Sequence, residues 1–164
     1  MLFLSTIQDR VLQFNDTDGL ALPALSTTLS AADRQGLVDD LSYGLPLLTG
    51  DTFRAFPSVT TRASAEGELV NLLVDGRITV ARCRGLLSAR GAAGLSRWSY
   101  QTDGSVTGGM ICLDADRDAG APPFRRGVRV HELGHALGYQ HVTVRTSIMN
   151  ITVALDAQIG RAHV

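Results

Sequence analysis

The sequence predicts an α+β fold, in which an early helix is followed by several strands and then by a second helix. Three observations predict it: leucines at near-helical spacing after residue 30, short β-type runs between residues 52 and 113, and a helical pattern that stops at a glycine near residue 138. The chain has 164 residues, 45% of them apolar and 19% charged, which suits one folded domain over residues 1–164. Residues 1–29 are mixed in character and could be an N-terminal extension of that domain.

The early helix is expected over residues 31–44. Ser30 is a candidate N-cap, and Asp33 adds negative charge to the first turn, where the helix dipole favours it. Leucines then follow at near-helical spacing. Gly44 and Pro46 indicate that this helix ends by about residue 44.

Strands are expected next, with mostly antiparallel pairing. Asp75-Gly76 is a hairpin turn signal, and Asp103-Gly104 joins a second pair of runs. The runs with strand character are Thr52–Phe56, Glu68–Val74, Ile78–Cys83, Trp98–Gln101 and Gly108–Leu113.

The second helix is expected from about Phe124 to Leu137, with Gly138 in the left-handed conformation that often ends a helix. A short terminal helix is expected over Ala154–Ala162.

The loop before the second helix, Asp114–Pro123, is acidic. Its alternating carboxylates resemble those of a calcium loop, but Ala119 and Arg125 stand where an EF-hand has glycine and glutamate. A solvated acidic loop is therefore the preferred interpretation, and structural Ca²⁺ has no support from the pattern.

Charge and hydropathy exclude several classes of function. The formal net charge is −1, so no bulk field favours nucleic acid or a charged membrane surface. No apolar run approaches the roughly 18 residues that a membrane span needs. The two cysteines, Cys83 and Cys112, could form one disulfide in an exported protein or remain two buried thiols, and the sequence leaves both alternatives open.

A motif with the pattern H-E-x-x-H-x-x-G-x-x-H begins at His131. His131 and His135 lie one turn apart on one face of a helix, so both imidazoles can reach a single ion. Glu132 follows about 100° round the helix, where it can accept a proton from water without being a ligand. Gly138 lets the backbone turn and bring His141 back as the third ligand. Three nitrogen ligands leave a fourth position open, as a catalytic zinc site requires.

The extended motif resembles that of the metzincin zinc endopeptidases. Met149 stands eight residues after His141, where that clan has its methionine turn, and the short gap most resembles the matrixin branch. Ile151 stands where astacins and serralysins have a tyrosine, so no tyrosine ligand is expected there. The resemblance implies a metzincin-like catalytic domain: a twisted mixed sheet, a backing helix, an active-site helix and a small C-terminal subdomain.

The resemblance also implies where substrate binds. In metzincins the strand before the active-site helix is the edge strand, and it binds an extended peptide by main-chain hydrogen bonds. Gly108–Leu113 holds that place in the sequence. The substrate-binding residues expected by position are Gly109, Met110, Ile111 and Cys112.

The predicted function is that of a zinc-dependent endopeptidase with one catalytic Zn²⁺ on His131, His135 and His141, and Glu132 as the general base. We expect a monomer that acts on a peptide or protein, in a secreted or extracytoplasmic location, although the chain shows no signal peptide. One alternative is a metzincin-fold module that binds zinc or peptide without cleaving. Another is a fragment that lacks its true N-terminus and folds poorly by itself.

Overall fold

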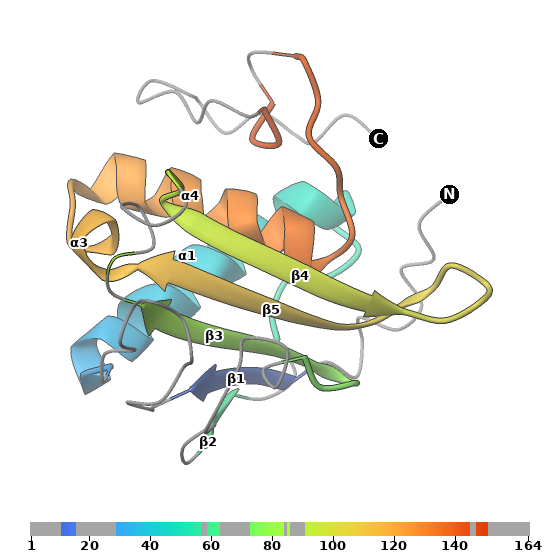
Figure 1. Ribbon diagram of the computed structural model, residues 1–164, viewed down its shortest axis with the longest axis horizontal. Coiled ribbons are helices and arrows are strands. Elements are labelled where there is room, and N and C mark those ends of the chain that lie inside the picture. Colours follow the sequence, from blue (N-terminus) through green and yellow to red (C-terminus); the bar gives the residue numbers. More distant parts are fainter. Residues whose placement is uncertain are drawn as a thin grey trace.

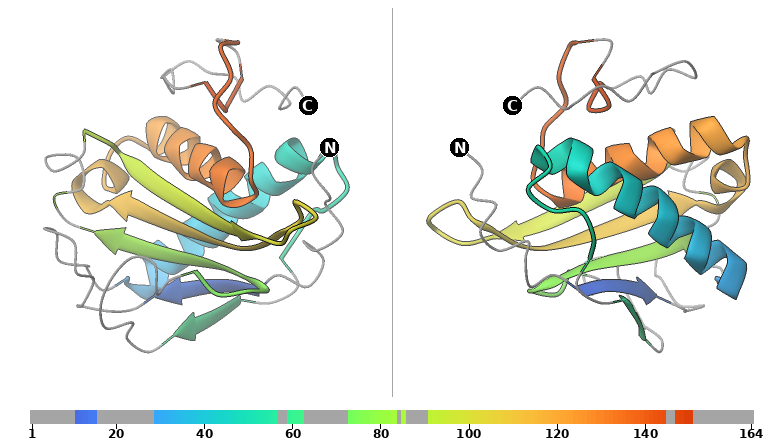
Figure 2. Two further views of the ribbon diagram at one scale, coloured as in Figure 1. Left: turned by 45° about the vertical axis from the view of Figure 1, so that its right-hand side comes forward. Right: turned by 180° about the vertical axis from the view of Figure 1, so that it is seen from behind.

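The computed structural model describes residues 11–15, 29–56, 59–62, 73–83, 85, 91–144 and 147–150, and these residues form an α+β fold. Their five strands make one mixed sheet in the order β2-β1-β3-β5-β4. Figures 1 and 2 show the two long helices on the same face of this sheet. The strands are β1 (Val11–Asn15), β2 (Val59–Arg62), β3 (Arg77–Cys83), β4 (Gly94–Tyr100) and β5 (Val106–Asp114), and the helices are α1 (Ala31–Thr49), α3 (Ala115–Asp118) and α4 (Pro122–Ala136).

The predicted mixed sheet with a backing helix, α1, and a helix that carries the motif, α4, is confirmed. The apolar core lies between the sheet and these two helices. It includes Leu37, Leu41, Leu45, Val80, Ile111, Val130 and Leu133. None of the helices in the described ranges is long and apolar enough to span a membrane.

Most strand pairs are parallel, so the prediction of mostly antiparallel pairing is wrong. β1 pairs in parallel with β2 and β3, and β3 pairs in parallel with β5; only β4 and β5 are antiparallel. The reason is that α1 connects β1 to β2, and a helical crossover returns the chain in the same direction. β1, Val11–Asn15, lies between β2 and β3 in the sheet.

β5 is an inner strand, and β4 is the edge strand at this side of the sheet. The prediction that β5 would bind a peptide as an edge is therefore wrong. Each of its residues Gly109, Met110, Ile111 and Cys112 is buried and pairs with β3 on one side and β4 on the other. Both strands and their turn were predicted, but β4 folds back as a hairpin onto the outer side of β5 and becomes the edge.

α1 begins where the sequence predicts. The side chain of Ser30 accepts a hydrogen bond from the main-chain N of Asp33 at 3.1 Å, and the Asp33 carboxylate in turn accepts from the main-chain N of Ser30. This capping box satisfies two main-chain donors at the start of the helix.

α1 continues to Thr49, so the predicted end near residue 44 is wrong, and Pro46 lies inside the helix. An internal proline costs roughly 3 kcal/mol. Leu45 and Leu48 are both buried in the core, and burial of two leucines contributes about as much in the opposite direction. The helix ends at Gly50, whose φ of 58° is left-handed.

The segment after α1 is not a strand. Thr52–Phe56 forms bends and irregular backbone, because the chain folds back against the end of α1. There the hydroxyl of Thr49 accepts a hydrogen bond from the main-chain N of Phe53 at 3.1 Å. The predicted runs Glu68–Val74, in its larger part, and Ala154–Ala162 lie outside the described residues, as does the predicted C-terminal subdomain.

The acidic loop contains the short helix α3, and two of its carboxylates, those of Asp114 and Asp118, are buried. Asp114 caps α3 by accepting from the main-chain N of Arg117 at 3.1 Å. Asp118 is 5% exposed and accepts hydrogen bonds from Arg82 and Arg129. The prediction of a solvated loop is therefore wrong at both aspartates: the cap bond from Arg117 compensates the burial of Asp114, and two arginines compensate that of Asp118.

Candidate metal centre

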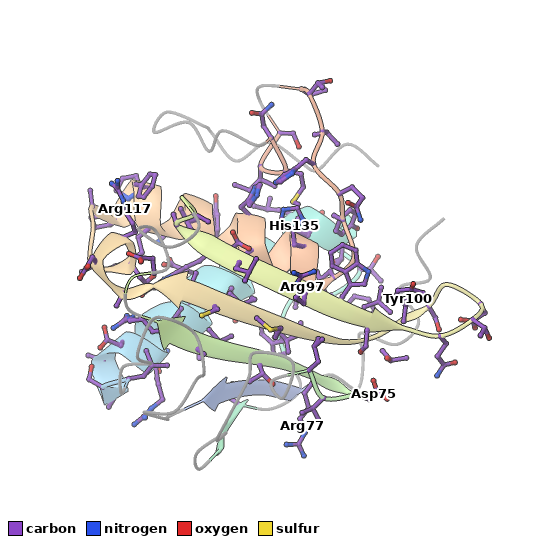
Figure 3. All side chains as sticks on the ribbon, in the orientation of Figure 1. Asp75, Arg77, Arg97, Tyr100, Arg117 and His135 are labelled. Atoms are coloured by element: carbon purple, nitrogen blue, oxygen red, sulfur yellow. The ribbon has the colours of Figure 1, made fainter. Side chains whose placement is uncertain are left out.

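The end of α4 and the turn after it bring three histidines together. His131 and His135 lie in the last two turns of α4, as the motif predicts. Gly138, with φ of 93°, reverses the chain, and His141 follows. The hydroxyl of Tyr139 donates to the main-chain O of Leu48 at 2.6 Å, which fixes this turn against α1. Figure 3 shows His135 on α4 close to the segment that carries the end of the motif.

The Nε2 atoms of the three histidines converge. Those of His131 and His135 are 3.1 Å apart, those of His131 and His141 are 3.2 Å apart, and those of His135 and His141 are 3.0 Å apart. Zinc bonds to histidine of about 2.0–2.1 Å in a tetrahedral arrangement place the nitrogens about 3.3–3.4 Å apart. The triad therefore fits a single metal ion of this size.

Main-chain carbonyls orient two of the rings. Nδ1 of His131 lies 2.6 Å from the carbonyl O of Ile148, and Nδ1 of His135 lies 2.8 Å from that of Tyr139. A carbonyl only accepts, so each Nδ1 carries the proton and each Nε2 presents a lone pair to the centre. Lone pairs this close repel unless a cation lies between them, which is a second reason why the site fits a metal ion.

Burial favours the neutral form of His131 and His135, which is the form that binds a metal ion. It lowers the pKa of His131 to about 4, helped by the neighbouring rings of His135 and His141. Burial also lowers the pKa of His135. Metal binding requires neutral imidazole, so both rings are in the binding form at neutral pH.

Met149, for which the sequence predicts a methionine turn, packs against α4. It is 2% exposed, and its sulfur packs against Gly134, in the turn of α4 between the two ligating positions. The main-chain N of Val142 donates to the carbonyl O of Met149 at 2.9 Å. This bond ties the methionine to the segment after His141 and so supports the third ligand.

Glu132 is a buried carboxylic acid beside the triad, 6% exposed. Burial raises its pKa to about 7, and a hydrogen bond from Ser96 acts in the opposite direction. The hydroxyl of Ser96 lies 2.7 Å from Oε2 of Glu132. A carboxyl group with a pKa near neutrality can take up and release a proton in this site.

A cavity of 620 Å³ opens over these groups. The histidines and Glu132 line it on one side, and the edge strand β4 with the residues before it lines the other. Phe124 and Val128 on α4 add apolar walls. The outer side of β4 has no partner strand among the described residues.

The structure brings together the four predicted site residues on α4 and its turn, but not the predicted substrate strand. Ser96, Phe124 and Val128 were not predicted as part of the site. Nothing in the sequence marks Ser96 as a site residue, because serine is common at half-exposed strand positions. The two apolar residues precede His131 by three and seven positions, so helical spacing could have placed them on the face of the ligands.

The fold and the triad together define a metal-binding α+β domain with a carboxylic acid beside the metal position. Residues 100–161 match the family model of the matrixins, peptidase family M10. The match covers less than half of the chain, and it includes the whole of α4, the whole motif and Met149. It confirms the resemblance to the matrixin branch of the metzincins and supports a metallopeptidase-type domain. A comparison with curated proteins finds no match.

Proposed function

We propose that this protein is a zinc-dependent endopeptidase, in which His131, His135 and His141 hold one zinc ion and Glu132 is the general base. The observation that carries the proposal is the convergence of three Nε2 atoms within 3.2 Å of one another, beside a buried carboxylic acid in one cavity. The match of residues 100–161 to the matrixins supports the same reaction class.

Zinc bound by the triad would supply Lewis-acid chemistry and lower the pKa of a bound water towards neutrality. The chain's own groups would move the protons. Glu132 takes the proton as water attacks the scissile carbonyl and passes it to the leaving amine. Its burial supports this role, because a pKa of about 7 allows both steps near neutral pH.

We propose β4, and not β5, as the strand that binds substrate. Gly94, Leu95 and Ser96 line the cavity, and the outer side of their strand is unpaired in the described part of the chain. An extended peptide can add to such an edge by main-chain hydrogen bonds, with its side chains pointing alternately into the cavity and away from it. Such binding is largely independent of side-chain identity, so specificity would come from the cavity walls.

We also propose a secreted or extracytoplasmic location. Cys112 is disulfide-bonded, and disulfides persist mainly in oxidising compartments. The disulfide corresponds to the first of the two alternatives that the sequence left open. Thiol alkylation of the purified protein, before and after reduction, tests it: we expect labelling only after reduction, and full labelling before reduction would contradict the proposal.

The test of the peptidase function combines metal analysis with cleavage of a mixed quenched-peptide library. We expect one zinc per chain and cleavage that a chelator abolishes. Glu132→Ala should keep the zinc and lower kcat by about 10²–10⁴-fold, the usual share of a general base. Asp116→Ala removes an exposed carboxylate and is the matched control. A zinc-loaded wild type that cleaves nothing would favour a binding module instead.

A further inference from the structure

The hydroxyl of Ser96 reaches two acceptors on one residue. Its Oγ lies 2.7 Å from Oε2 of Glu132 and 2.9 Å from the main-chain O of Glu132. The hydroxyl has one proton, and both acceptors belong to the same residue, so Ser96 stays bonded to Glu132 whichever it serves. Among the described residues, no other side chain makes a hydrogen bond to this carboxylate.

Gly94 packs against the same carboxylate. A Cβ atom at Gly94 would lie 2.5 Å from Cγ of Glu132 and 2.6 Å from its Oε1, distances that real Cβ contacts do not show. The side chain of Glu132 therefore packs directly on the bare main chain of Gly94. Because side chains two residues apart on a strand point the same way, Gly94 and Ser96 form one seat on the face of β4 that meets α4.

We infer that Ser96 is a positioning residue for the reaction: its hydroxyl, with the bare face of Gly94, holds the carboxylate of Glu132 towards the cavity. This inference rests on the proposed function. A glutamate side chain has three rotatable bonds, and a hydrogen bond at its end removes most of that freedom. A general base must lie within hydrogen-bond reach of the proton it takes, and a misplacement of about 1 Å can cost up to 10²-fold in rate.

The first test is kinetic. Ser96→Ala is expected to lower kcat by about 10–100-fold, as loss of a supporting hydrogen bond does in metal sites, with KM within about twofold and zinc content unchanged. Ser96→Thr keeps a hydroxyl and is expected to restore most of the rate. The matched control is Ser99→Ala on the same strand, whose hydroxyl bonds to Asp75 and not to the site; it should keep the wild-type kcat.

A second variant changes the surroundings of the Glu132 carboxylate and leaves Ser96 unchanged. Gly94→Ala places a methyl group against Glu132, so we expect a loss of kcat with zinc retained. If Ser96→Ala folds and binds zinc but keeps the wild-type kcat, the inference is wrong. It is also wrong if Ser99→Ala loses as much rate as Ser96→Ala, because the effect would then belong to the strand as a whole.

A spectroscopic measurement separates this inference from the peptidase proposal. The chain has three glutamates, so ¹³C labelling of glutamate carboxyl carbons gives three signals, and the one missing in Glu132→Gln belongs to Glu132. In the metal-free protein Ser96→Ala should shift that signal, and Ser99→Ala should not. If the signal shifts but the wild type is inactive, the positioning role of Ser96 is supported and the peptidase proposal is refuted. If the signal does not shift, the positioning role is refuted whatever the activity.

Discussion

A single hydrogen atom at Gly134 separates α4 from Met149. A Cβ atom there would collide with the sulfur of Met149. Glycine in the middle of a helix normally costs about 1 kcal/mol relative to alanine. The close approach of Met149 explains why this position nevertheless requires glycine.

We therefore expect Gly134→Ala to lower the free energy of unfolding by about 1–3 kcal/mol, as overpacking does, although alanine is the better helix former. Gly36→Ala in α1 is the matched control, because its Cβ would meet only the end of Arg129 at 3.6 Å. That change should raise the free energy by up to about 1 kcal/mol. Urea unfolding of the metal-free proteins measures both, and a gain in stability for both variants would contradict the packing argument.

Burial of Glu132 makes the stability of the metal-free protein depend on pH. The folded protein holds this carboxyl at a pKa of about 7, above its ordinary value of 4.5. As pH rises from 4.5 to about 7, the unfolded chain ionises first, so the folded state loses stability, on the order of 3 kcal/mol. Glu132→Gln stays neutral and lacks this loss.

We expect the unfolding free energy of Glu132→Gln, minus that of the wild type, to increase from pH 4.5 to about pH 7 and to be constant above it. The histidines are common to both proteins, so their titration cancels in the difference. Denaturant melts in the presence of a chelator, at intervals of half a pH unit, measure it. A difference that does not change with pH would mean that Glu132 is not buried as described.

The residues of the metal centre could be predicted because their spacing is local. His131, Glu132 and His135 lie within five residues, and the geometry of one helix determines where they point. Ser96 could not be predicted, because it reaches Glu132 only through the packing of β4 against α4. A contact between residues this far apart in sequence produces no periodic pattern from which it could be predicted.

At the scale of elements, a buried arginine fixes the position of α4. Arg129 is 1% exposed and donates to Asp118 of α3 at 2.7 Å and to Asp40 of α1 at 3.0 Å. Arg126 also pairs with Asp40, and Arg82 also pairs with Asp118. Charges buried this deeply need partners, and these pairs connect three helices and β3 beside the ligand His131.

Removal of the Arg129 side chain should destabilise the folded state. We expect Arg129→Ala to lower the free energy of unfolding by about 3 kcal/mol, at the lower end for a broken buried pair because each aspartate keeps a second arginine. Arg54→Ala is the control: its pair with Asp51 is 3.9 Å long and 79% of the Arg54 side chain is exposed, so less than about 0.5 kcal/mol is expected. Urea unfolding measures both, and equal effects would refute the network.

The elements themselves were only partly predictable. The start of α1 followed from its cap and most of α4 from the spacing of the motif, which are local signals, but α4 begins at Pro122, two residues before its predicted start. The continuation of α1 through Pro46 depends on burial of its leucines, and the edge position of β4 depends on which side of β5 the hairpin joins. Both are decided by tertiary packing, which outweighs local preference.

At the scale of the whole molecule, the metal centre joins the end of α4 to the segment that follows it. His131 and His135 lie on α4, His141 follows the turn, and the carbonyl of Ile148 holds the ring of His131. An ion at the triad therefore connects the end of α4 to the segment around Met149. Anything that binds the folded state alone raises its stability.

Zinc is accordingly expected to stabilise the protein by about 2.7 kcal/mol when free zinc exceeds the dissociation constant 100-fold. For a domain of this size that corresponds to a rise in Tm of roughly 5–10 °C. Glu132→Gln keeps all three ligands and should show the full rise, whereas His135→Ala loses one of them and should lose most of it. Thermal melts with chelator and with zinc measure the effect for each protein. An equal rise in His135→Ala would place the stabilising zinc at another site and remove the structural basis of the proposed peptidase.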